Sequence, residues 1–393
     1  MVEAKVEYQG RLEKFLKIAE NKDRQHLRVG YAKLLVLGGG LLVLWGIFAR
    51  HWITAWWLIA PVVAYGLFAT LHGQILTAKI RAITAANFYR RGIARIEDRW
   101  VGSGSTGERF RNSNHVYADD LDLFGRGCLF ELLSTARLPM GESQLASWLC
   151  EGSGLPEILE RQDLVRELRE KVDLREDVAV MGEELGARLN AERLMEWAER
   201  DSVLPARTWR WIVALLALAA GVAGVYYLST AALWPLLCIF VVEAAILAWL
   251  RRKAHSVMEG VDCNAEGLVL FAAILERLER ESFEAPRLRQ FAEELKRENA
   301  AAAQALRQFA RIVYWIDAGD GVLAKMAELP FLYSVQVAMA AEAWRRRCGA
   351  KLRRWAEIAG EVEALLSLAG YSYEHAEDPF PEFVAAENGV GFF

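Results

Sequence analysis

A glycine-rich run at residues 102–107 is the first stretch whose residue types could do chemistry. Its letters, GSGSTG, fit the pattern G-x-G-x-x-G, in which backbone N–H groups approach the phosphates of a dinucleotide. That chemistry needs a buried strand before the motif and a helix that opens at its end. Here Glu108, Arg109 and Phe110 follow without an apolar helical period. The sequence therefore predicts a turn and no dinucleotide site.

Patterns for nucleotide hydrolysis, metal binding and nucleophilic catalysis are missing from the sequence. The pattern G-x-x-x-x-G-K-[ST] does not occur, so the loop that cradles nucleotide phosphates is absent. The cysteines contain no C-x-x-C pair, and the histidines form no cluster with ligand spacing. The acidic residues are spread over solvated helix faces. We predict no catalytic residue and no metal site.

Six basic residues on one predicted helix are the main candidate for a binding surface. They are Arg345, Arg346, Arg347, Lys351, Arg353 and Arg354. Trp344, Cys348, Leu352 and Trp355 form the apolar stripe of the same helix, which leaves the charges for its other faces. Two interpretations stay open. The charges contact phosphates of DNA or of anionic lipid, or they form a solvated face that pairs with nearby glutamates.

Glu243 is an intramembrane polar candidate, because it lies near the middle of a long apolar segment. An ionised carboxylate is costly inside a bilayer, so such a residue is a candidate for a functional site, here in a small transporter. No second acid or base joins it in that segment to form a relay. The simpler interpretation is a protonated side chain that is hydrogen-bonded within or between helical hairpins.

The composition favours a membrane protein. The 393 residues are 54% hydrophobic and include 14 Trp, which is too apolar for an ordinary cytosolic enzyme. The formal net charge is −4 at pH 7, which argues against a protein held to nucleic acid mainly by bulk charge. A membrane is therefore the first expected partner.

Two regions are apolar for long enough to cross a bilayer, and each divides into two spans. The spans comprise residues 31–49, 52–71, 211–228 and 233–250. About 20 residues, at about 1.5 Å per residue, match a hydrocarbon thickness of roughly 30 Å. The sequence therefore predicts four spans in two helical hairpins.

Basic residues flank the outer ends of both hairpins, whereas the connecting turns carry only Arg50 and His51. The flanking residues are Arg24, Arg28, Lys33, Lys79, Arg81, Arg90, Arg91, Arg207, Arg210, Arg251, Arg252 and Lys253. The positive-inside rule predicts that both termini and the middle segment are cytoplasmic. A signal peptide is not expected, because the first apolar stretch begins only at Tyr31, behind a charged segment.

The segment from Tyr117 contains short motifs in a distinctive order. A small residue, Leu, an aromatic residue and a leucine pair occupy 128–133, and Gly141 follows. Leu-x-x-Trp-Leu occupies 145–149, and Arg-x-Asp-x-Val-x-x-Leu occupies 161–168. This order resembles the opening of the core domain in the MutS family of DNA mismatch-repair ATPases. Leu138 and Pro139 depart from the family pattern, in which a second Thr precedes the Gly.

Further segments resemble a membrane-anchored bacterial branch of that family, in which two transmembrane hairpins bracket the core block. These segments are IEDRW at 96–100, GERF at 107–110, HVYADDLDLFG at 115–125 and DLREDVAVMG at 173–182. EVEALLSLAGYSYE at 361–374 resembles the helix by which the MutS core returns after its lever and clamp insertion. DPFPEFVAAENGVGFF at 378–393 resembles the linker into the nucleotide-binding domain.

The resemblance implies a mainly α fold, with a MutS core/lever-like helical domain and two transmembrane helical hairpins in the bacterial inner membrane. The implied order is an N-terminal cytoplasmic helix (1–30), hairpin 1 (31–71), a linker helix with a Gly/Ser turn (72–114), the first part of the core (115–206), hairpin 2 (207–253), lever-like helices with the core return (254–372), and a linker toward an ATPase domain (373–393).

The implied function is that of a membrane-anchored protein related to DNA mismatch repair, namely the core and levers of a DNA-binding ATPase. ATP and Mg²⁺ are implied for the full-length relative, whereas this chain is expected to bind no cofactor and to hydrolyse no ATP. We expect it to be a truncated or interrupted form. DNA is an implied partner, and the implied homodimer forms mainly through the ATPase domain. The alternative is a membrane scaffold without DNA or nucleotide activity.

Overall fold

Two compact units make up the fold. The computed structural model describes residues 2–48, 54–186, 188–201, 204, 208–259, 261, 263–296, 301–319, 321, 325–326, 328, 332–386 and 389–392. The smaller unit comprises Met1–Thr106, Arg126–Leu132 and Gly370–Phe393. The larger unit comprises Gly107–Gly125 and Leu133–Ala369. The mainly helical fold that the sequence predicts is confirmed.

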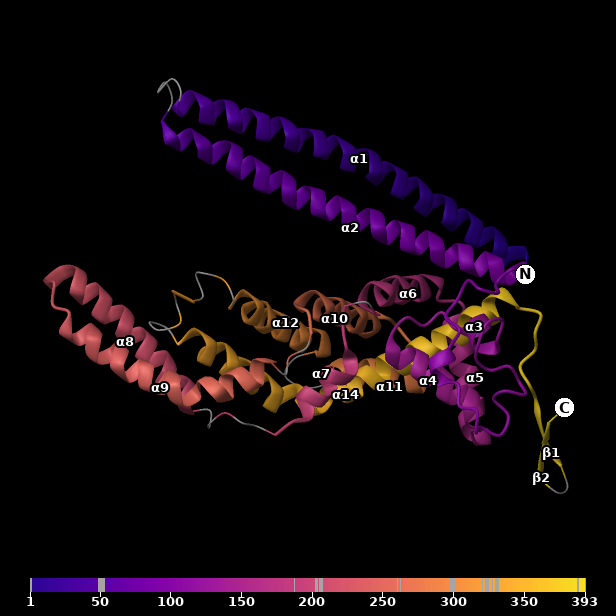
Figure 1. The fold of residues 1–393 in the computed structure, drawn as a ribbon. Coiled ribbons are helices and arrows are strands. Elements are labelled where there is room, and N and C mark those ends of the chain that lie inside the picture. The colour runs from indigo at the N-terminus through magenta and orange to yellow at the C-terminus, as the bar shows by residue number, and fades with distance from the viewer. Residues whose placement is uncertain are drawn as a thin grey trace. The chain divides into compact units, whose positions relative to one another are not determined.

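A long helical hairpin dominates the smaller unit (Figure 1). Helix α1 (Val2–Phe48) packs along α2 (Ile59–Ile96), and the short 3-10 helix η1 (Ala55–Leu58) precedes α2. Pro61 lies in the first turn of α2, where its missing N–H costs no helical hydrogen bond. The predicted turn at Arg50 and His51 lies outside the described residues.

Three further short elements complete the smaller unit. Helix α3 (Leu129–Leu133) lies mostly within it. Strands β1 (Phe383–Ala386) and β2 (Gly389–Phe392) form an antiparallel hairpin, with Phe383 opposite Phe392 and Ala386 opposite Gly389. This hairpin falls within the stretch in which the sequence predicts a linker.

The larger unit is a helical bundle from which a second hairpin projects (Figure 1). Its elements are η2 (Glu108–Phe110), α4 (Pro139–Cys150), α5 (Leu155–Arg169), α6 (Val172–Gly186), α7 (Ala191–Glu199), α8 (Thr208–Thr230), α9 (Trp234–Glu259), α10 (Ala265–Arg280), α11 (Pro286–Lys296), α12 (Ala302–Ala318) and most of α14 (Tyr333–Glu374). Helix α10 packs against α6 and α12, and α8 packs against α9.

Local sequence signals set several helix starts in this bundle. Asn190 precedes α7 and its side chain accepts a hydrogen bond from the N–H of Arg193. Asn264 does the same for α10 through the N–H of Glu266. Such side chains satisfy N–H groups that have no partner within the helix. Pro139 opens α4, where proline is preorganised for the first turn.

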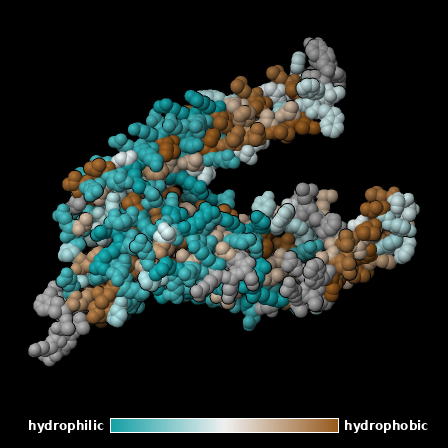
Figure 2. Space-filling view, turned by 180° about the vertical axis from the view of Figure 1, so that it is seen from behind, coloured by the Kyte–Doolittle hydropathy of each residue, from teal (hydrophilic) through white to brown (hydrophobic). Residues whose placement is uncertain are grey.

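Among the described residues, three helices are long and apolar enough to cross a membrane, rather than the four that the sequence predicts. They are Val2–Phe48, Trp56–Ile96 and Trp234–Met258. In the predicted span at 211–228, the described apolar helix is only Ala214–Thr230. That stretch belongs to α8, which as a whole runs from Thr208 to Thr230. Figure 2 shows hydrophobic residues, in brown, over the outer parts of both hairpins.

An aromatic stack holds the inner end of α9 in the larger unit. The rings of Trp197, Phe309 and Trp344 all contact one another, with centroids 5.0 Å apart for Trp197 and Phe309, 4.2 Å for Phe309 and Trp344, and 6.3 Å for Trp197 and Trp344. Trp197 Nε1 donates to the carbonyl of Val257, at 3.0 Å, and Trp344 Nε1 donates to that of Ala305, at 2.8 Å. Helices α7, α9, α12 and α14 therefore meet at one buried point.

The variant Trp344→Ala tests this arrangement. Removing a buried tryptophan should lower the free energy of unfolding by about 3–5 kcal/mol, because the stack loses its contacts and a cavity remains. Chemical unfolding in detergent, followed by the helical circular dichroism signal, measures the loss. The control Trp315→Ala removes an exposed ring and should change the same quantity by less than about 0.5 kcal/mol. Equal losses in both variants would contradict the proposed role of the stack.

Candidate functional site

The long helix α14 carries the main candidate residues at three places along its length. The basic residues lie in its first half, Glu363 lies in its second half, and Glu374 is its last residue. Residues up to Ala369 belong to the larger unit, and the rest belong to the smaller unit. At each place a charged side chain of α14 contacts another element of its own unit.

Arg345 and Arg346 bind the chain segment that leads into hairpin 2. Arg345 is buried, and its Nη2 donates to the carbonyl of Asp201 at 2.9 Å and to the carboxylate of Glu342 at 2.6 Å. Its guanidinium also lies over the ring of Trp197. Arg346 donates to the carbonyl of Leu204 at 2.7 Å. These two residues therefore fix backbone just ahead of α8.

The other predicted arginines also have protein partners. Arg347 donates to Gln308 at 3.1 Å, Arg353 binds both carboxylate oxygens of Glu199, and Arg354 binds both oxygens of Glu294. The hydrogen bond and charge of Arg353 lower the pKa of Glu199. Lys351 is half-buried on the same helix. A phosphate at this face would compete with existing ion pairs, and phosphate contact stays a prediction.

Glu363 is a buried carboxylate that caps another helix. Its Oε1 accepts from the N–H of Arg137 at 2.8 Å, and its Oε2 accepts from the N–H of Leu138 at 3.1 Å. Leu138 immediately precedes α4, so the carboxylate lies at the positive end of that helix. A Cβ on Gly141 would overlap with the Glu363 carboxylate. Only glycine allows this close approach.

The contact extends along α14 on both sides of Glu363. The N–H of Thr135 donates to the hydroxyl of Ser367 at 3.1 Å. A Cβ on Gly360 would come within 2.9 Å of the carbonyl of Met140. Two segments that are more than 200 residues apart in sequence therefore pack closely. We call this contact the α4–α14 junction, and define it by residues 135–141 and 360–367.

Burial raises the pKa of Glu363 to about 8, while the hydrogen bonds from the backbone of Arg137 and Leu138 act in the opposite direction. Glu363 was not predicted as a site residue from the sequence. In the structure it lies in a run, from Ile358 to Ala369, in which nearly every residue is buried. A glutamate is almost never fully buried without a partner, so such a position demands one.

Glu374 joins α14 to the base of hairpin 1 within the smaller unit. Arg95 of α2 donates to both carboxylate oxygens of Glu374, through Nε at 2.6 Å and through Nη2 at 2.5 Å. Both side chains are buried. Tyr8 of α1 stacks on the ring of Tyr373, with centroids 5.7 Å apart. The ends of three helices are therefore joined by one buried ion pair and its aromatic surroundings.

The glycine-rich run forms a turn that binds a carboxylate of the same chain. The N–H groups of Gly102, Gly104 and Gly127 donate to Glu131, at 2.6, 3.2 and 2.8 Å. Gly102 and Gly127 have positive φ angles of 83° and 74°, which favour glycine. The amides that could bind a phosphate are thus occupied by the buried Glu131.

Glu243 is fully buried in α9, and its carboxylate oxygens have no hydrogen-bond partner among the described residues. The small residues Ala217, Ala220 and Ala223 form the buried face of α8. The predicted hydrogen bond of Glu243 within or between hairpins is therefore not seen in the described part of the chain.

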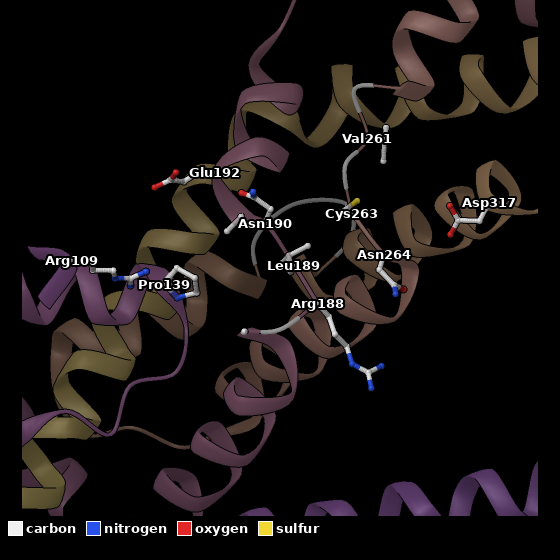
Figure 3. A pocket seen from close by; sticks show the side chains of 12 residues that line it. Arg109, Pro139, Arg188, Leu189, Asn190, Glu192, Val261, Cys263, Asn264 and Asp317 are labelled. Carbon is white, nitrogen blue, oxygen red and sulfur yellow. The ribbon is translucent and has the colours of Figure 1, made fainter. Parts of the chain in front are cut away.

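A polar groove of about 820 Å³ lies in the larger unit, next to the beginnings of α7 and α10 (Figure 3). Its lining includes Arg109 and Arg188, but these pair with Glu142 and Glu266. The described residues contain no group of three or more His, Cys, Asp or Glu that could hold a metal ion. The groove therefore offers hydrogen-bonding groups with little excess charge.

Comparison with models of protein families, with curated proteins and with solved structures gives no match.

The pKa of Glu363 predicts a specific pH dependence. Because the folded-state pKa lies above its ordinary value of 4.5, the folded protein binds the proton more tightly than the unfolded chain does. This contribution to stability is complete below the unfolded pKa and is lost as pH rises to about 8. The variant Glu363→Gln cannot titrate at this position, so it should not lose this stability as pH rises. The free energy of unfolding of the variant should therefore rise relative to that of the wild type between pH 5 and pH 8, by at most roughly 1.4 kcal/mol per pH unit.

Denaturant unfolding at several pH values measures this difference. The control Glu357→Gln alters an exposed carboxyl of the same helix that lies outside the α4–α14 junction. If the free energies of unfolding of wild type and Glu363→Gln differ by the same amount at every pH in this range, Glu363 does not titrate as described.

The buried Arg95–Glu374 pair predicts a non-additive pair of substitutions. Glu374→Leu should lower the free energy of unfolding by about 3–5 kcal/mol, because Arg95 would remain buried without its counter-charge. The double variant Arg95→Met with Glu374→Leu should recover most of this loss, since no buried charge remains. Thermal unfolding of the single and double variants gives the coupling energy. Additive losses would contradict direct pairing.

Proposed function

We propose that this chain is the membrane-anchored core and lever portion of a MutS-like, DNA-binding protein. The observation that carries the proposal is the α4–α14 junction. The motif block that begins at Cys128 and the segment 361–374 both resemble parts of the MutS core, and the junction brings them together through Glu363. The same contact explains why position 141 of the motif is a glycine, because a Cβ there would overlap with the Glu363 carboxylate.

Helix α14 fits the role of a lever. Its 42 residues span about 63 Å at about 1.5 Å per residue. In the larger unit it is attached to the chain ahead of hairpin 2 through Arg345 and to α4 through Glu363. In the smaller unit its end is attached to α2 through Glu374. A displacement of α14 would therefore be felt at the base of each hairpin.

The membrane part of the proposal rests on the three long apolar helices. Basic residues at the inner ends of the hairpins, such as Arg251, Arg252 and Lys253, favour cytoplasmic termini in the bacterial inner membrane. ATP and Mg²⁺ belong to the nucleotide-binding domain of full-length relatives, through which a homodimer would form.

DNA binding by the full chain in phospholipid nanodiscs tests the proposal. We expect binding to a fluorescent duplex, measured by anisotropy, that weakens as salt rises because phosphate contacts release counterions. Arg347→Ala with Lys351→Ala should reduce the affinity by about tenfold, since each phosphate contact contributes to it. The control is Arg289→Ala, which removes an exposed arginine of α11 and should reduce the affinity for the duplex less. No binding at low salt would overturn the DNA-binding role.

A membrane scaffold without DNA activity is the second candidate. The observation that favours it is that all five predicted arginines are already bonded to protein groups. In this alternative function, the basic cluster stabilises the base of hairpin 2 and the helices packed around it. The same binding experiment separates the two functions, because a scaffold predicts no salt-dependent affinity for the duplex.

A further inference from the structure

An exposed aromatic and basic surface lies at the C-terminal end of α12. Tyr314 and Trp315 are 62% and 53% exposed, and Met326, shortly after the helix, is 71% exposed. Arg311 lies one turn before the aromatic pair, and it is exposed, as is Lys325. The opposite face of α12 is buried through Phe309, Ala310 and Val313. We call the exposed residues 311, 314, 315, 325 and 326 the α12 foot.

The α12 foot is close to the root of α9. Val261 and Asn264, which follow α9, line the same groove as Asp317 at the end of α12 (Figure 3). Deeper in the bundle, Phe309 of α12 stacks on Trp197, whose indole binds the carbonyl of Val257 in α9. Contacts at two levels therefore hold α12 beside the point at which the membrane helix enters the larger unit.

The C-terminal end of α12 lies on the side of the larger unit from which hairpin 2 projects (Figure 1). Arg251, Arg252 and Lys253 end the apolar part of α9, and they lie about 6–9 Å along that helix from Val257. Trp315 lies about 9 Å along α12 from Phe309. In Figure 1 the end of α12 and the start of α14 lie toward the side from which α8 and α9 project. The hydroxyl of Tyr333 in α14 donates to the carbonyl of Trp315, which fixes this end.

The chemistry of the foot matches a phospholipid surface. Tyr and Trp are enriched where a protein crosses from hydrocarbon to water, because each ring has an apolar body and a polar group. Arg311 and Lys325 complement anionic headgroups. Two described acids lie in this part of the larger unit: Asp317 lines the groove of Figure 3, and Glu328 accepts hydrogen bonds from the N–H and the hydroxyl of Ser334. We propose that the α12 foot inserts into the headgroup layer of the leaflet that α9 enters, as a contact with the membrane additional to the spanning helices.

This proposal rests on the membrane insertion of α9 and is independent of the MutS-like role. Photocrosslinking of the full chain tests it, in nanodiscs of phosphatidylcholine with and without phosphatidylglycerol. A benzophenone amino acid is placed by Trp315→p-benzoylphenylalanine, and lipid adducts are counted by mass spectrometry. Leu237, exposed on α9, serves as the position inside the membrane, and Val116, exposed in the larger unit, serves as the position in water.

We expect lipid adducts at positions 237 and 315, with a yield at 315 on the order of tenfold above that at 116, because interfacial rings lie among headgroups. Arg311→Gln with Lys325→Gln should reduce the share of phosphatidylglycerol adducts. A yield at 315 equal to that at 116, or adducts to protein alone, overturns the foot while α9 stays in the membrane. A loss of adducts at 237 as well overturns both the foot and the membrane insertion of α9.

Discussion

The bundle depends on how one buried carboxylate is satisfied. Glu363 lies where α14 crosses the start of α4, and the N–H groups of Arg137 and Leu138 are the donors that it reaches. Leaving such donors without an acceptor costs about 1–3 kcal/mol each. Separating α14 from α4 would therefore leave two N–H groups at the start of α4 without an acceptor and the carboxylate on α14 without donors. The glycine at 141 then becomes a condition of the contact, because a side chain there would displace the carboxylate.

Two patterns of apolar side chains divide the rest of the described chain. The hairpins expose leucines and valines, as is typical of helices that can cross a membrane, whereas the bundle encloses its apolar side chains. The change from exposed to enclosed apolar side chains occurs at the base of each hairpin. There the structure places buried hydrogen bonds and ion pairs: Trp197 with Val257 in the larger unit, and Arg95 with Glu374 in the smaller. Such directional contacts define the geometry of a root better than apolar packing alone does.

Periodicity and hydropathy predict the helical class and three of the apolar spans, because both signals are local. The fourth predicted span, at 211–228, lies in α8, whose described apolar part is Ala214–Thr230. The basic cluster was located correctly on one helix, but its partners come from α7, α11 and α12 and from the chain before α8, which spacing cannot reveal. Glu363 and Glu131 were missed for the same reason. Their donors are backbone groups, and backbone groups leave no mark in the sequence.

Trp344 and Glu363 are separated by nineteen residues of uninterrupted helix, and each has partners on different neighbours. Inserting a single residue between them would rotate one contact by about 100° relative to the other and shift it by about 1.5 Å. Substitutions on the exposed face of this stretch should change the free energy of unfolding much less. Over evolutionary time the stretch should therefore vary in composition but not in length, because even an insertion of about seven residues, which nearly restores the rotation, would move one contact by about 10 Å along the helix axis.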